Sequence, residues 1–131
     1  MADETRNASD VPSPSFILAE ITIDCIDVKA VARFWSSVLG AELWAPLDGW
    51  LRLGPLTDGG PVINFQPVPE PKRGKARLHL DLWTNDLNQA IATVENLGGR
   101  SLDEGHVYDE GTVVVMADPE GHEFCLVGRT H

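Results

Sequence analysis

The feature that most constrains this chain is an internal repeat. A shift of 59 residues places Asp27 on Asp86 and AEITIDCID on LHLDLWTND, with apolar residues on apolar residues. A shift of 61 residues aligns Gly60 with Gly121 and places VINFQ on EFCLV. The 131 residues are therefore expected to fold as two copies of one unit that share a core.

Each copy predicts the element order βαβββ. Strand-like alternation in FILAEITIDCI and in RLHLDLWTN is followed by an aspartate that can cap a helix, Asp27 or Asp86. Apolar residues then recur at helical spacing until Gly40 and until Gly98. The strands predicted after the helices are 42–44, 50–53 and 61–66 in the first copy, and 100–102, 112–116 and 122–127 in the second.

The repeat also predicts the domain organisation. Residues 1–15 are polar and contain prolines without periodicity, so we expect a flexible arm. One domain follows over 16–128, with a first module at about 16–67 and a second at about 77–128. The segment between them, 68–76, is rich in proline and in Lys and Arg, which is typical of a linker.

Charge and composition narrow the classes of partner. The net charge of −10 disfavours binding to nucleic acids and to anionic membranes, and no apolar run is long enough to span a bilayer. The two cysteines, Cys25 and Cys125, form no CxxC pair, and no signal peptide is evident, so we expect a cytoplasmic protein. A small molecule or a protein partner remains.

Side-chain alternation places many polar groups on one face of the predicted strands. That face would carry Glu20, Thr22, Asp24, Asn64, Gln66, His79, Asp81, Trp83, Glu123 and Cys125. The opposite face is apolar and would be covered by the helices. Because buried polar groups need partners, the polar face predicts a solvated or ligand-filled pocket. The alternative is an ordinary sheet with one face in water.

The stretch ADPEGHEFCLVG raises the question of a metal site, since His122, Glu123 and Cys125 are close in sequence. Alternation places Glu123 and Cys125 on one face of the strand and His122 on the other. DPEG is itself a turn signal. We therefore interpret this stretch as a hairpin turn, with His122 at the surface.

Two βαβββ units, the helix ends VLGAEL and NLGGRSL, and the closing hairpin DPEGHEFCLV resemble the vicinal oxygen chelate superfamily. This group includes glyoxalase I, extradiol dioxygenases, fosfomycin-resistance transferases and bleomycin-binding proteins. The resemblance covers Ile17 to Gly128 and is strongest to small glyoxalase-like proteins. It implies an α+β fold in which two modules form a cup-shaped mixed sheet with helices on the convex face. It also implies a homodimer.

The resemblance further implies where a divalent ion would bind. The family's ligand positions correspond to Glu20 and His79 on the first strands, and to Asn64 and Cys125 on the last strands. Asn64 and Cys125 depart from the carboxylates expected there, because such ions prefer histidine nitrogen and carboxylate oxygen. We therefore expect no tightly bound cofactor, with a divalent metal as the alternative.

Three functions are compatible with the sequence. The first is metal-free binding, or catalysis, of a small organic molecule in the cup. The second is a metal-dependent lyase, isomerase or dioxygenase, and the third is a structural domain with an empty cup. The candidate catalytic residues are His79 and Glu123, and the candidate ligand-binding residues are Asp24, Asn64, Gln66, Asp81, Trp83 and Trp50. His79 is equally compatible with a neutral hydrogen-bonding role.

Overall fold

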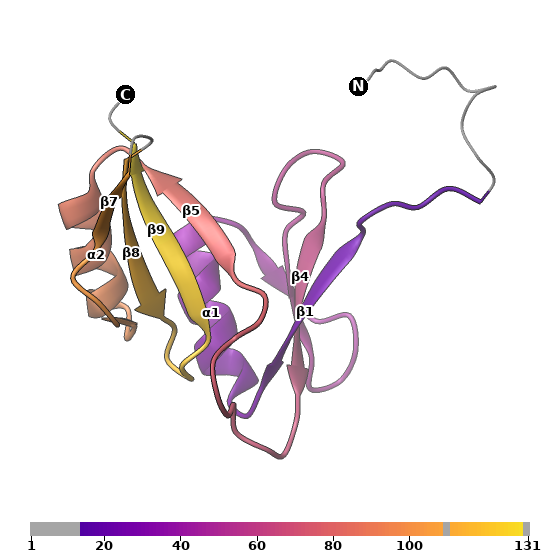
Figure 1. The fold of residues 1–131 in the computed structure, drawn as a ribbon. Coiled ribbons are helices and arrows are strands. Elements are labelled where there is room, and N and C mark those ends of the chain that lie inside the picture. The colour runs from indigo at the N-terminus through magenta and orange to yellow at the C-terminus, as the bar shows by residue number, and fades with distance from the viewer. Residues whose placement is uncertain (1–13, 109–110, 130–131) are drawn as a thin grey trace.

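The computed structural model describes residues 14–108 and 111–129, so most of the predicted arm lies outside the described residues. The first module contains β1 (Glu20–Cys25), α1 (Val28–Leu39), β2 (Leu43–Trp44), β3 (Leu51–Leu53) and β4 (Val62–Pro67). The second contains β5 (Leu80–Thr84), α2 (Leu87–Asn96), β6 (Arg100–Ser101), β7 (His106–Tyr108), β8 (Gly111–Ala117) and β9 (Glu123–Arg129). The fold is α+β with two mixed sheets (Figure 1).

The two sheets have the same topology, which confirms the duplication. The strand orders are β1-β4-β3-β2 and β5-β9-β8-β6, with β7 added beside β8. In each sheet the first strand is parallel to the last strand of its module, and the remaining pairs are antiparallel. Within the described residues, no strand of one sheet pairs with a strand of the other.

Two details differ from the prediction. The first strand starts at Glu20 rather than near Phe16, because its partner β4 starts at Val62, directly opposite Glu20. The segment expected as a loop before β8 contains the short strand β7, in which His106 pairs with Val113. Residues beyond the end of the neighbouring strand have no strand to pair with. Alternation alone therefore overestimates the length of a strand.

Both helices begin at the predicted aspartates. The Asp27 carboxylate accepts a hydrogen bond from the Ala30 amide at 3.1 Å, and Asp86 accepts one from the Gln89 amide at 3.1 Å. These bonds satisfy amides that the first helical turn leaves unpaired. Gly40 ends α1 with a φ of 66°, a left-handed conformation that glycine adopts without steric cost.

Helix α1 joins the two halves through the core. Trp35 of α1 packs against Phe124 of β9 with ring centroids 4.8 Å apart, and Phe34 lies 6.0 Å from Phe124. All three rings are buried. A first-module helix therefore contributes apolar surface to the second sheet, so the modules share one core, in agreement with the expectation.

The strands present a polar face opposite this core. Along β1, Glu20, Thr22 and Asp24 are exposed, whereas Ile21 and Ile23 are partly buried. We call the helix-free face of each sheet its inner face. No helix among residues 14–108 and 111–129 has the length and apolar character needed to cross a membrane.

Candidate functional site

The inner face of the first sheet is organised around Arg52. Trp44, Arg52, Asn64 and Thr22 lie opposite one another on successive strands. The Arg52 guanidinium donates from Nε to Asn64 Oδ1 at 2.6 Å and from Nη2 to Glu20 Oε1 at 3.1 Å. Asn64 Nδ2 also donates to Glu20 Oε1 at 2.5 Å, and the guanidinium lies 5.1 Å from the Trp44 ring centroid. A fixed cation therefore already neutralises the Glu20 carboxylate.

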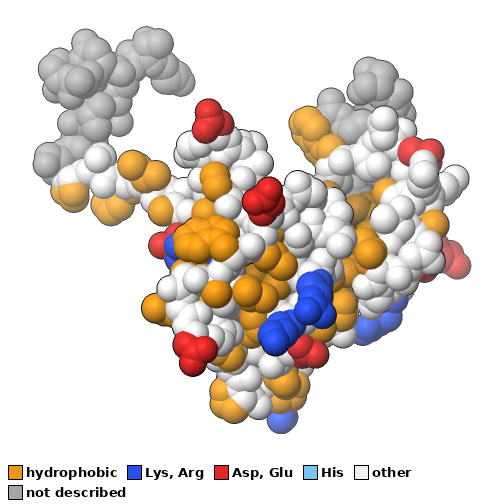
Figure 2. Space-filling view, turned by 180° about the vertical axis from the view of Figure 1, so that it is seen from behind, with side chains coloured by type: hydrophobic (Ala, Val, Ile, Leu, Met, Phe, Trp, Pro, Cys, Tyr) orange, Lys and Arg blue, Asp and Glu red, His pale blue; other side chains and the backbone are white. Residues whose placement is uncertain are grey.

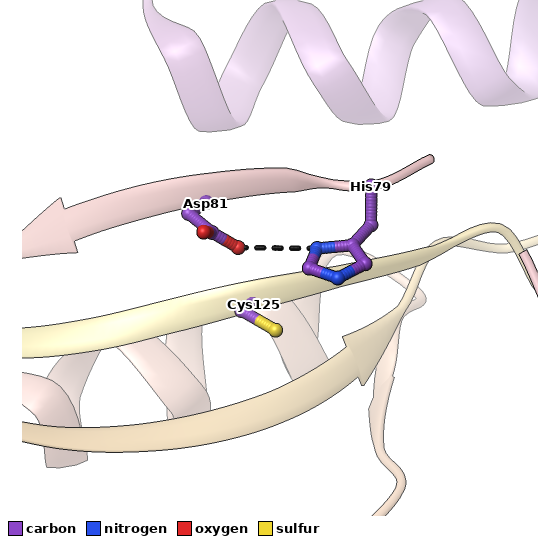
Figure 3. Close-up of side chains that lie close together, drawn as sticks. All are labelled: His79, Asp81 and Cys125. Carbon is purple, nitrogen blue, oxygen red and sulfur yellow. Dashed lines mark hydrogen bonds and ion pairs between the residues drawn. The ribbon is translucent and has the colours of Figure 1, made fainter. Parts of the chain in front are cut away.

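The inner face of the second sheet carries a different cluster. His79, just before β5, and Asp81 on β5 lie beside Cys125 on β9, with ligand atoms within 4.8 Å of one another (Figure 3). His79 Nδ1 lies 3.2 Å from Asp81 Oδ1. Burial, and then the charge of Asp81, raise the pKa of the Cys125 thiol above its ordinary value. Cys125 is therefore a protonated thiol at neutral pH rather than a reactive thiolate.

The four residues at the family's metal-ligand positions do not form one site. Glu20 and Asn64 are engaged by Arg52, whereas His79 and Cys125 turn toward Asp81. In the part of the chain that the structure describes, the cluster of close ligand atoms contains no atom of Glu20. A neutral amide, a protonated thiol and an ion-paired carboxylate are a poor donor set for a hard divalent ion, so these residues do not fit the metal that the fold family implies.

A cleft of about 410 Å³ lies between β1, the beginning of β5 and the linker. Its apolar lining includes Ile21, Trp35, Leu80 and Phe124. Its polar lining includes Thr22, Asp24, His79, His122 and Glu123. The cleft exists because the edges of β1 and β5 are not paired with each other. It combines an apolar floor with a few convergent polar groups, as ligand pockets generally do.

Glu123, a predicted catalytic residue, holds the linker. Its Oε1 atom lies 2.9 Å from Lys72 Nζ and accepts a hydrogen bond from the Ala76 amide at 3.0 Å. The hydrogen bond from Lys72 lowers the pKa of Glu123 below its ordinary value. Glu123 is thus an ion-paired carboxylate that fastens residues 72–76 beside the cleft, and its availability as a proton acceptor depends on the linker moving away.

The remaining predicted binding residues are distributed over other places. Asp81 and Trp83 line a second cavity of about 640 Å³ between α1, β5 and α2. Gln66 lies opposite Asp24 on β4, and both Gln66 and Trp50 are outside the linings of the two cavities. Figure 2 shows the molecule from behind, where apolar side chains reach the surface between scattered charged ones. Of the predicted ligand-binding set, the cleft therefore gathers Asp24, together with the predicted catalytic pair His79 and Glu123.

His122 does not converge with Cys125, as alternation predicts. It lies instead against Asp118 in the turn between β8 and β9, and against the backbone of Asp24. Asp118 is fully buried and also accepts a hydrogen bond from Trp35 Nε1 at 2.9 Å. Neither Asp118 nor Arg52 is among the residues predicted from the sequence. The alternation of β3 contains a signal for Arg52, since it places this side chain on the inner face beside Asn64.

Residues 20–127 match the family model described as a glyoxalase-like domain. Among solved structures, a glyoxalase/bleomycin resistance protein/dioxygenase family enzyme from Burkholderia phytofirmans superposes with a TM-score of 0.67 at 15% identity, covering 87% of this chain and 99% of that one. A glyoxalase-related enzyme from Fulvimarina pelagi gives 0.66 at 18% identity, covering 85% and 86%.

A mutant of the fosfomycin resistance protein FosX from Listeria monocytogenes, complexed with Mn(II) and 1S,2S-dihydroxypropylphosphonic acid, gives a TM-score of 0.69 at 15% identity and covers 88% and 91%. Identities this low show a shared fold and leave the chemistry open. No curated protein matches the sequence.

Proposed function

Because the chain belongs to the glyoxalase-like domain family, whose fold serves both catalysis and binding, we propose that it binds a small organic molecule without a tightly bound metal. The observation that carries this proposal is the cleft of about 410 Å³ between β1, β5 and the linker. Its volume is within the range of pockets that accept small molecules.

The chemistry of the cleft suggests the kind of molecule. Leu78 and Leu80, which are exposed and partly exposed, offer apolar surface, which favours a ring or a short hydrocarbon. Thr22 and His79 supply hydrogen-bonding groups at the rim, and Asp24 supplies a carboxylate. Acidic and cationic side chains both line the cleft, so its charge selects neither strong anions nor strong cations. A mainly apolar ligand with one or two polar groups fits this lining best.

One observation favours the metal-dependent alternative. His79, Asp81 and Cys125 form a three-ligand cluster on the second sheet, and a FosX relative of the same fold is complexed with Mn(II). A cluster of this composition suits a thiophilic ion such as zinc better than manganese. Elemental analysis of protein purified without chelator separates this alternative from the metal-free one.

A fluorescence titration with N-phenyl-1-naphthylamine, an uncharged and mainly apolar probe, tests the proposal. Thr22 lines the cleft and Thr93 lines the second cavity, and both side chains are exposed. Thr22→Trp should fill the cleft and weaken probe binding at least about tenfold, a loss of about 1.4 kcal/mol. Thr93→Trp, the matched control, should leave binding unchanged. Equal binding by both variants and the wild type would refute binding in the cleft and favour the structural alternative.

Two further predictions concern the assembly of the protein and its location in the cell. Size-exclusion chromatography with light scattering tests the homodimer, and cell fractionation tests the cytoplasmic location. The cleft described above is lined by residues of one chain.

A further inference from the structure

Both ring nitrogens of His122 face hydrogen-bond acceptors. Nδ1 lies 2.9 Å from Asp118 Oδ1 and 2.8 Å from Asp118 Oδ2, and Nε2 lies 2.9 Å from the Asp24 carbonyl oxygen. A backbone carbonyl and an ionised carboxylate can only accept hydrogen bonds, whereas a neutral imidazole carries one N–H. The arrangement therefore requires a ring that is protonated on both nitrogens.

The Asp118 carboxylate is the counter-ion of this ring. It is fully buried and accepts hydrogen bonds from Trp35 Nε1 and from the backbone amides of Glu120 and His122, at 2.9, 2.9 and 3.0 Å. Burial raises the pKa of Asp118, but its bonds to His122 and Trp35 outweigh burial and lower it. Burial lowers the pKa of His122, but the hydrogen bond and charge of Asp118 outweigh that effect and raise it.

These contacts connect the two modules. His122 belongs to the turn 118–122 of the second module, and the Asp24 carbonyl that it binds belongs to β1 of the first. In the same turn, Glu120 Oε1 accepts a hydrogen bond from the Ile26 amide at 2.9 Å, and Oε2 accepts one from the Asp27 amide at 2.5 Å. We call residues 118–122 the clamp. Within the described residues the two sheets share no strand pairing. The modules are instead connected by the apolar contact between α1 and β9 and by the polar contacts of the clamp.

We infer that protonation of His122 fastens the clamp between the modules, and that loss of this proton loosens β1 from the turn. The charges that act on the ring are those of Asp118 and Glu120 in the turn itself. Asp24 and Asp27 contribute backbone groups to the clamp. The cleft that His122 lines also carries the side chains of Asp24, Glu123, His79, Lys72, Arg73 and Lys75. Deprotonation removes one N–H, so the ring can no longer donate to both the Asp24 carbonyl and the Asp118 carboxylate.

The clamp borders the cleft, because His122 and Asp24 both line it. If the cleft binds a small molecule as proposed above, affinity should fall as His122 loses its proton, since the wall formed by β1 would no longer be fixed. This extension rests on the proposed function. The proton-dependent clamp itself does not, and it is tested without any ligand.

The direction of the pH effect follows from the raised pKa. A histidine whose pKa is raised by folding adds stability that is fully present below its unfolded pKa of about 6.5 and is lost as pH rises through its folded pKa. The clamp should therefore be fastened in mildly acidic solution and loosen as the pH rises through the folded pKa of His122.

The first test is an NMR titration of the histidine rings in the intact wild-type protein. We expect His122 to carry protons on both nitrogens at about pH 6 and to titrate above about 6.5. Protection of the Ile26 and Asp27 amides against hydrogen exchange should fall over the same pH range. The Gln89 amide, which is held by the Asp86 cap of the second module, is the internal control. A neutral His122 ring at about pH 6 would overturn the inference.

The second test compares two identical substitutions. His122→Gln should lower the melting temperature by several degrees at about pH 6, and the difference from wild type should shrink toward about pH 9. His106→Gln is the matched control, because His106 is an exposed histidine on the outer strand β7. Its side chain pairs with Asp103, which precedes that strand. The change in melting temperature caused by His106→Gln should be small, and it should not shrink between about pH 6 and about pH 9 as expected for His122→Gln. The same pH dependence in both variants would contradict a clamp at His122. If His122→Gln fails to fold, the wild-type titration still decides the question.

Discussion

Arg52 of the first module and Val115 of the second occupy equivalent positions, yet the polar groups beside them are arranged differently. Arg52 lies opposite Asn64, and Val115 lies opposite Cys125, the residue that matches Asn64 in the repeat. The long cation reaches Asn64 and Glu20, whereas the short apolar side chain reaches no polar partner. His79 and Asp81 therefore turn to each other and to Cys125. Equal topology thus gives two different inner faces, because the side chains at matching positions differ.

The turns before the last strands differ in the same way. Asp118 of the second module matches Thr57 of the first in the 61-residue register. Asp118 is buried and anchors the clamp, whereas Thr57 is exposed in a turn closed by a hydrogen bond from the Gly60 amide to the Thr57 carbonyl. The second module therefore holds the first through this turn, whereas the matching turn of the first module makes no such contact within the described residues.

The largest expected effect comes from removing the Asp118 carboxylate, which anchors the clamp. Asp118→Ala should lower the free energy of unfolding by about 3 to 5 kcal/mol, because it leaves the His122 ring and the Trp35 N–H without their buried acceptor. Thr57→Ala, at the matching position, should change it by less than about 0.5 kcal/mol. Urea denaturation of both variants measures the difference. Equal effects would show that the clamp does not join the modules.

The next effect tests the inner face of the first sheet. Arg52→Val gives the first module the residue of the second, and it leaves the buried Oδ1 atom of Asn64 without a donor. We expect a loss of about 1 to 3 kcal/mol in urea denaturation. Arg77→Val, at an exposed position just after the linker, is the control and should stay within about 0.5 kcal/mol. If Arg52→Val leaves the free energy of unfolding unchanged, the guanidinium contacts contribute no net stability.

Much of this arrangement could be predicted from the sequence. A repeat indicates that two modules share one topology, and alternation indicates which face of a strand each side chain occupies. The duplicated βαβββ order, the Asp27 and Asp86 caps and the polar inner face all follow from local periodicity. The contacts of Arg52 and Asp118 do not, because they join residues that are distant in sequence through side chains whose reach depends on packing. Whether β1 and β5 pair across the module boundary is likewise a tertiary property.

A smaller effect concerns the linker. Glu123 holds Lys72, and Val62 stands at the matching position of the first module, where no such ion pair is possible. Glu123→Gln keeps an oxygen that can accept the Ala76 amide but loses the ion pair. Trypsin should then cleave after Lys72 about threefold to tenfold faster, because cleavage follows the population of the opened linker. Glu70→Gln, on the exposed linker, should cleave at the wild-type rate, and an identical rate for Glu123→Gln would exclude the fastening.

The smallest effect is expected from removing metal. Protein purified without chelator should carry well under one equivalent of divalent ion, and chelator should leave its melting temperature nearly unchanged. An occupied site would add roughly 2.7 kcal/mol at a hundredfold excess of ion over Kd, so stripping it would be visible. If elemental analysis finds close to one ion per chain, and His79→Ala abolishes it, the second module's cluster is a metal site.

The most direct test of ligand binding in the cleft is an amide NMR titration with the uncharged probe N-phenyl-1-naphthylamine. We predict that the largest shifts occur at Ile21 to Asp24 of β1 and at His79 and Leu80, which line the cleft from its two sides. Binding within a preformed cleft perturbs the residues of its walls and leaves distant elements unchanged. Shifts confined to residues 81–93 around the second cavity, or no shifts at all, would contradict the account.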